Sequence, residues 1–124
     1  MSDERQPFKK TIADIPIEDA HGGSGSRRLL LDSTDPISRN LEAMTEGFLP
    51  PGKAFDWHTH HLVGEFFIVT QGTGFIEYDG DGYKGEKKID YKEGDLIYSP
   101  ANISHRLENT GTVDNKFLFI RVAV

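Results

Sequence analysis

The apolar residues of this chain come in short packets, separated by glycine, proline, asparagine or aspartate. From Arg39 onward, no window of about 11 residues keeps the apolar spacing of an amphipathic helix. Packets of this kind are typical of β-strands. The pattern predicts strands at residues 27–32, 41–48, 54–60, 65–70, 74–78, 83–91, 95–99, 105–109 and 117–122. An all-β chain with this many short strands folds as a sandwich or a barrel.

The start of the chain differs from the rest. Residues 1–10 are mostly polar and charged, and residues 21–26 form the Gly/Ser-rich run HGGSGS. We therefore predict an N-terminal arm and Gly/Ser loop over residues 1–26 and a β-barrel domain over residues 27–124. Residues 1–10 are expected to be either a flexible tail or an arm that is ordered only by contact with a partner subunit. A chain of 124 residues suits a single core of this size.

Composition removes several classes of function. A formal charge of −6 opposes binding to nucleic acid or to an anionic membrane surface. The chain has no cysteine, so disulfides and thiolate metal sites are excluded, and a metal ion must bind to nitrogen and oxygen. No apolar stretch has the length of a signal-peptide core or a membrane span, which leads us to expect a cytoplasmic protein.

The segment Tyr78-Asp-Gly-Asp-Gly-Tyr83 predicts a tight hairpin turn, because Asp-Gly pairs accept the positive φ that such turns require. The two aspartates of this segment raise the alternative of a calcium-binding loop. The further ligands of an EF-hand loop are missing at the required spacing, so the plain turn is the better interpretation.

Candidate metal chemistry is concentrated in the run from Gly52 to Gly72. Side chains alternate between the faces of a strand, so His58 and His60 project from the same face. The residues after them can turn the chain and place Glu65 at the start of the next strand, beside the pair. Two histidines and one carboxylate are ligands typical of non-haem iron sites, and they also suit manganese, nickel or zinc.

A second run, from Gly94 to Asn109, carries another histidine. Gly94 turns the chain into a strand, Pro100 ends it, and His105 begins a return strand that could reach the same site. His61 faces away from the pair and is interpreted as an exposed non-ligand, with a proton carrier at the mouth of the pocket as the alternative. The alternative to a metal site is a set of histidines that only hydrogen-bond inside a barrel that has lost its metal.

Strand parity also assigns faces to neighbouring residues. The predicted barrel interior contains Ala54, Asp56, Phe67, Val69 and Leu107. On the opposite face of the first of these strands, Phe55 and Trp57 are expected to cover the outside or to enter a subunit contact. Arg121, on the last strand, is either a contact for an anionic substrate or an ordinary surface arginine.

These two runs resemble the two motifs of the cupin superfamily. The first resembles its motif at Gly52, His58, His60, Glu65 and Gly72, and the second at Gly94, Pro100, His105 and Asn109. Asn102 stands where the family usually has glycine, a substitution that asparagine tolerates at positive φ. The resemblance implies a double-stranded β-helix, or jelly-roll barrel, with a divalent iron, manganese, nickel or zinc ion bound by His58, His60, Glu65 and His105. It also implies a homodimer, with Phe55, Trp57, Phe66 and Phe75 as candidate contact residues.

Three hypotheses for function follow. The first is a metal-dependent enzyme, an oxygenase, isomerase or lyase, that acts on a small oxygen-bearing metabolite. The second is a module that binds a small ligand such as a sugar or an acid without turnover. The third is a purely structural barrel that binds no metal. The fold does not choose between them, because function depends on the lining of the pocket.

Overall fold

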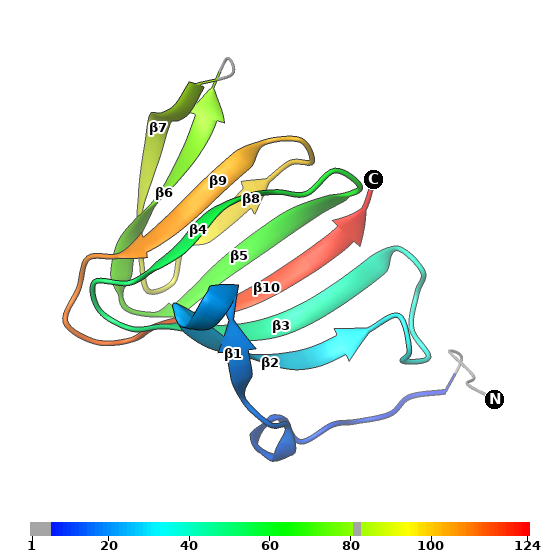
Figure 1. The fold of residues 1–124 in the computed structure, drawn as a ribbon. Coiled ribbons are helices and arrows are strands. Elements are labelled where there is room, and N and C mark those ends of the chain that lie inside the picture. Colours follow the sequence, from blue (N-terminus) through cyan, green and yellow to red (C-terminus); the bar gives the residue numbers. More distant parts are fainter. Residues whose placement is uncertain (1–5, 81–82) are drawn as a thin grey trace.

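The computed structural model describes residues 6–80 and 83–124, and it is almost entirely β-structure (Figure 1). Two 3₁₀ turns, η1 (Ile12–Asp14) and η2 (His21–Gly23), lie near the N-terminus. The strands are β1 (Glu18–Ala20), β2 (Gly25–Asp32), β3 (Leu41–Leu49), β4 (Ala54–Thr59), β5 (Val63–Gln71), β6 (Thr73–Gly80), β7 (Tyr83–Lys92), β8 (Leu96–Ser99), β9 (Ser104–Asn109) and β10 (Asn115–Ala123). Within these residues, neither helical turn has the length or apolar character needed to cross a bilayer.

The strands form two antiparallel sheets. The larger has the order β1-β2-β3-β10-β5-β8 and the smaller has the order β4-β9-β6-β7. Strand β10 therefore lies between β3 and β5, and β9 lies between β4 and β6, although these strands are far apart in sequence. This arrangement is the predicted jelly roll, and each of the nine predicted strands overlaps an observed one.

The sequence pattern did not predict β1. This short strand pairs with β2, with Glu18 opposite Arg27 and Ala20 opposite Gly25, and η2 makes the turn between them. Figure 1 shows β1 next to β2, at the edge of the larger sheet. Residues 18–26 thus extend this sheet, and the division of the chain at residue 26 stays a prediction.

The core lies between the two sheets. Alternation on β3 turns Ala43, Thr45, Gly47 and Leu49 inward. The buried cluster between the sheets consists of Leu49, Phe55, Phe67, Val69, Ile76, Tyr91, Leu107 and Phe117. Burial of large apolar side chains on both inner faces is what holds the two sheets together.

The assignment of faces on β4 was wrong. Phe55 was expected outside but is 3% exposed in the core, whereas Asp56 was expected inside and its side chain is 80% exposed. Phe55 pairs with Leu107 and His58 pairs with His105, so β4 contains one more residue than β9 across this interval. This β-bulge breaks the simple alternation and lets Phe55 and His58 both turn inward.

The turn residues of the two motifs have the expected backbone. Gly52, Gly72 and Gly94 have φ of 75°, 92° and 93°, and Asn102 has φ of 69°. The asparagine therefore replaces glycine at a left-handed position, as predicted. Residues 81–82, the tip of the predicted Asp-Gly turn, lie outside the described residues. The choice made there between a plain turn and a calcium site stays a prediction.

The last residue of the second motif, Asn109, connects three segments at one end of the barrel. Its buried Nδ2 donates to the carbonyl oxygens of Leu49 and Val113, each at 2.8 Å, and its Oδ1 accepts from the Gly111 N–H at 2.8 Å. The amide is 1% exposed, so no solvent would replace these partners.

We predict that Asn109→Ala lowers the free energy of unfolding by about 3 kcal/mol, because it leaves buried backbone groups without partners. Urea unfolding measures the change. The control is Asn40→Ala, which truncates an exposed amide between β2 and β3. Equal stability losses in the two variants would contradict the role assigned to Asn109.

Candidate metal centre

Four predicted residues from three parts of the chain meet between the sheets. His58 lies on β4, His60 follows the end of that strand, Glu65 lies on β5, and His105 lies on β9. Pairing of His58 with His105 places these two imidazoles beside each other, with ring centroids 4.3 Å apart. Each of the four residues offers one ligand atom, and all these atoms lie within 4.8 Å of one another.

The inner atoms of this cluster have few partners in the protein. Nε2 of His60 and Nε2 of His105 are buried and make no hydrogen bond within the part of the chain that the structure describes. They lie 3.5 Å and 3.7 Å from Oε1 of Glu65. Unpaired buried nitrogens are costly, and a cation between them and the carboxylate would satisfy all three atoms. The cluster therefore fits a divalent metal site.

The outer nitrogens of two imidazoles are held by the protein. Nδ1 of His58 donates to the carbonyl oxygen of Asp56 at 2.7 Å, and Nδ1 of His105 lies 3.2 Å from Oγ of Ser99. A proton on Nδ1 leaves the lone pair on Nε2, the atom that faces the cluster. Contacts of this kind orient histidine ligands in metal sites.

Glu65 is ionised despite its burial. The carboxylate is 3% exposed, and this burial by itself would raise its pKa. The nearby imidazoles of His105 and His60 and the charge of Arg121 outweigh the burial and hold the pKa of Glu65 well below its usual range. Arg121 Nε donates to Oε2 of Glu65 at 2.8 Å, so one carboxylate oxygen is held by the arginine while Oε1 faces the histidines.

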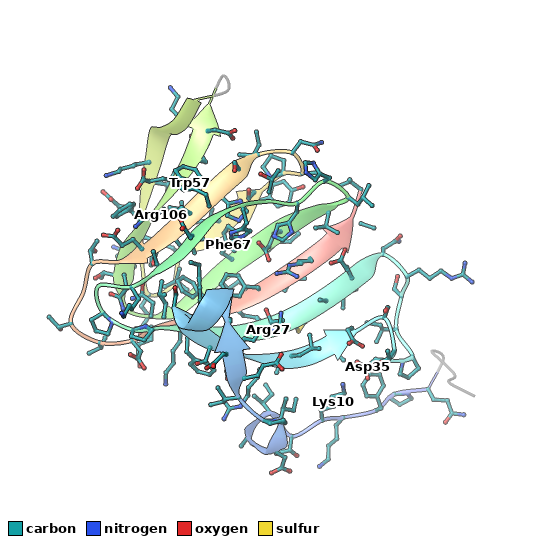
Figure 2. All side chains as sticks on the ribbon, viewed as in Figure 1. Lys10, Arg27, Asp35, Trp57, Phe67 and Arg106 are labelled. Carbon is teal, nitrogen blue, oxygen red and sulfur yellow. The ribbon has the colours of Figure 1, made fainter. Side chains whose placement is uncertain are left out.

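A cavity of about 340 Å³ opens beside the cluster. Figure 2 labels Phe67 between the two sheets and Arg27 on β2, and both residues line this cavity. Its wall also contains His58, Glu65 and Arg121, so that a ligand in the cavity would contact the candidate metal centre directly.

Sequence reasoning found part of this site. The structure brings His58, His60, Glu65 and His105 together, and places His61 on the surface, where its Nδ1 lies 3.0 Å from Oδ1 of Asn102. Sequence reasoning missed the cavity residues supplied by the first three strands, namely Asp19, Ser26, Arg27 and Thr45. Their positions depend on β1 and on long-range pairing, for which the local pattern held no signal.

The lowered pKa of Glu65 predicts a pH-dependent stability of the metal-free protein. Its interactions stabilise the fold above the pKa of an unfolded glutamate, about 4.3, and the stabilisation is lost as the pH falls below that value. Glu65→Gln should therefore flatten the decline in unfolding free energy between about pH 5 and about pH 3. Urea unfolding of chelator-treated protein tests this, with the exposed Glu42→Gln as control. An unchanged slope in Glu65→Gln would contradict the prediction.

Comparisons with known proteins place this geometry in a family. Residues 47–121 match the cupin domain model. An uncharacterised protein of Methanocaldococcus jannaschii is 30% identical over 77 residues, which cover 62% of this chain and only 57% of that relative. An oxalate-binding protein of Thermotoga maritima is 28% identical over 105 residues, covering 84% of this chain and 82% of the relative.

Solved structures show the same fold. A predicted oxalate decarboxylase of Thermotoga maritima superposes with a TM-score of 0.81 at 23% identity, covering 94% of this chain and all of that one. A tryptophan-to-tyrosine variant of the oxalate decarboxylase of Bacillus subtilis gives 0.75 at 24% identity, covering 92% of this chain and 29% of the other. With the domain match across 47–121 and the jelly roll observed here, this chain belongs to the cupin family.

Proposed function

We propose that His58, His60, Glu65 and His105 bind one divalent metal ion and that the protein captures a small carboxylic acid at this ion. The observation that carries the proposal is the convergence of two buried, unpartnered imidazole nitrogens on one carboxylate oxygen. Three imidazoles and one carboxylate suit iron, manganese, nickel or zinc, and such a set leaves coordination positions for a ligand. When bound, the metal would supply a Lewis acid that attracts and polarises a carboxylate oxygen.

The surrounding residues prepare the site for an anion. Arg121 balances the charge of Glu65, since its Nε lies 2.8 Å from that carboxylate. The charge of a divalent ion would therefore stay uncompensated by the protein. Buried Phe67 and Leu107 give the same cavity an apolar wall. Attraction between an ion and an anionic ligand is stronger beside such a wall than in bulk water.

Oxalate is the first ligand to test. The Thermotoga maritima relative that covers most of this chain is an oxalate-binding protein. Oxalate presents two adjacent carboxylates, a dianion that can take neighbouring positions on one metal ion. Both its charge and its oxygen ligands match what the cavity offers next to Glu65.

Turnover is the second candidate, because a ligand in the cavity would lie next to the candidate metal centre. For oxalate, cleavage of the carbon–carbon bond with uptake of one proton would give carbon dioxide and formate, with no external oxidant. Isomerase and oxygenase chemistry on other small metabolites are the further enzyme classes that the family resemblance suggests.

A homodimer and a cytoplasmic location stay predictions from the sequence. Of the predicted partners, a small-molecule ligand is the one that the cavity supports. Nothing in the described residues or the comparisons suggests binding to nucleic acid or to a membrane.

We predict that the purified protein, produced without a histidine tag, contains close to one equivalent of a first-row divalent metal. The double variant His58→Ala, His105→Ala should lose it, because it removes the two paired imidazoles. Elemental analysis by mass spectrometry measures the content after reconstitution at neutral pH, where the imidazoles are free to bind. His61→Ala, which changes a neighbouring exposed histidine, is the matched control. A metal content unchanged in the double variant would overturn the assigned ligands.

We further predict metal-dependent oxalate binding. Calorimetric titration of the reconstituted protein should show saturable binding that chelator treatment abolishes and metal restores. Formate release, followed by nuclear magnetic resonance, separates the two candidates: formate that is released by the wild type and lost in the double variant His58→Ala, His105→Ala establishes turnover, and binding without formate establishes capture. Equal binding with and without metal would reject the proposed role of the ion.

A further inference from the structure

The cavity is much larger than oxalate requires. Its volume of about 340 Å³ lies within the range of pockets that enclose drug-sized ligands, roughly 300–1,000 Å³. Oxalate has only two carbons and would occupy the metal end alone. The remaining volume is lined by side chains of a different character, and these indicate what else the ligand contains.

The lining changes from one end of the cavity to the other. At the metal end lie His58, Glu65 and Arg121. The apolar part contains Phe55, Phe67, Leu107 and Phe119, with the Phe67 and Phe119 rings at 86° and their centroids 5.4 Å apart. Such a set of ring edges and faces suits a flat or branched apolar group. The part formed by β1 and β2 is polar again and contains Asp19, Ser26 and Arg27.

Strand register separates the two polar parts. Glu65 on β5 pairs with Arg121 on β10, whereas Arg27 on β2 pairs with Gly47 on β3. Strands β3 and β10 lie between β2 and β5, so three interstrand steps separate them, about 14 Å across the sheet. A ligand that binds the metal and also contacts Arg27 must therefore be considerably longer than oxalate.

Arg27 is available for an anionic group. Its Nε donates to Oε1 of Glu18 at 2.9 Å, and within residues 6–80 and 83–124 its guanidinium makes no other hydrogen bond, which leaves the two terminal nitrogens as donors. The neighbouring Arg28 differs: it points to the other face of β2, where it contacts Glu46 and the carbonyl oxygen of Ile15. A guanidinium with two unused nitrogens in a cavity wall is well suited to a carboxylate.

The charges of the lining agree with this. Within the cavity, Asp19 and Glu65 balance Arg27 and Arg121. A divalent ion would add two positive charges to this lining, which an anionic ligand offsets, while Glu18 already contacts the Nε of Arg27 from outside the lining.

We propose that the cavity binds a dianionic acid in which an aromatic body separates a metal-binding carboxylate from a second carboxylate, and that Arg27 selects this ligand by contacting the second carboxylate. This inference rests on the proposed metal site. It adds the substrate class and a specificity residue that lies far from the metal.

Four acids test the two parts of the ligand separately: oxalate, pyruvate, benzoylformate and 4-carboxybenzoylformate. Pyruvate and benzoylformate share the 2-oxo acid and differ in the aromatic ring, and the last compound adds only the distal carboxylate. Calorimetry on the manganese-reconstituted protein gives each Kd. We expect benzoylformate to bind tighter than pyruvate, and 4-carboxybenzoylformate about tenfold tighter than benzoylformate, equivalent to about 1.4 kcal/mol.

Arg27→Gln should abolish the tenfold difference and leave the Kd of benzoylformate unchanged. Arg28→Gln removes the same charge one residue away, on the outer face of β2, and should keep the difference. Thermal unfolding checks that both variants are folded. Equal affinity of the wild type for the two aromatic acids, or a difference that survives in Arg27→Gln, overturns the inference. If oxalate still binds in a metal-dependent way, the proposed function survives that result. Failure of all four acids to bind overturns both.

Discussion

The site depends on a charged carboxylate buried between two apolar sheet faces. Glu65 is 3% exposed and retains its charge because Arg121 contacts one oxygen while two imidazoles approach the other. An isolated carboxylate in this position would be protonated or would prevent the sheets from packing. The pair is possible because β10 lies directly beside β5, which places Glu65 and Arg121 opposite each other. The order of the strands thus makes the chemistry of the site possible, and the unpaired imidazole nitrogens make a cation its natural completion.

The bulge on β4 decides which side chains the core and the site receive. With strict alternation, Phe55 and His58 would lie on opposite faces. The additional residue on β4 between these two positions, relative to β9, turns Phe55 into the core and His58 into the cluster. The same interval exposes Asp56, whose carbonyl oxygen accepts the hydrogen bond from Nδ1 of His58. The bulge on β4 therefore places Phe55 in the core, orients the imidazole of His58 and turns its Nε2 toward the cluster.

The sequence was sufficient for the fold class and for the four candidate residues: strand packets with turn residues indicated an all-β sandwich or barrel, and the resemblance to the two cupin motifs implied the jelly roll and the set of four ligands. It failed where the answer depends on distant partners. The face of Phe55 depends on a bulge that forms only against β9. The role of Arg121 depends on its pairing with β5, and sequence reasoning left it between the pocket and the surface. Strand β1 is only three residues long and gave no pattern to read.

The part of the chain that matches the cupin model forms one end of the cavity and leaves out residues that line the other end. The cupin match covers residues 47–121 and therefore includes all four candidate ligands and Arg121. It does not include Asp19, Ser26, Arg27 or Thr45, which line the same cavity from β1, β2 and the first half of β3. The metal end of the cavity is thus built from the part of the chain that resembles many cupins, and much of its polar far end from the part that the match leaves out. Under the proposed function, ligand choice can change through the N-terminal strands without altering the candidate metal centre, which makes Arg27 a more informative position for substrate identity than any of the four candidate ligands.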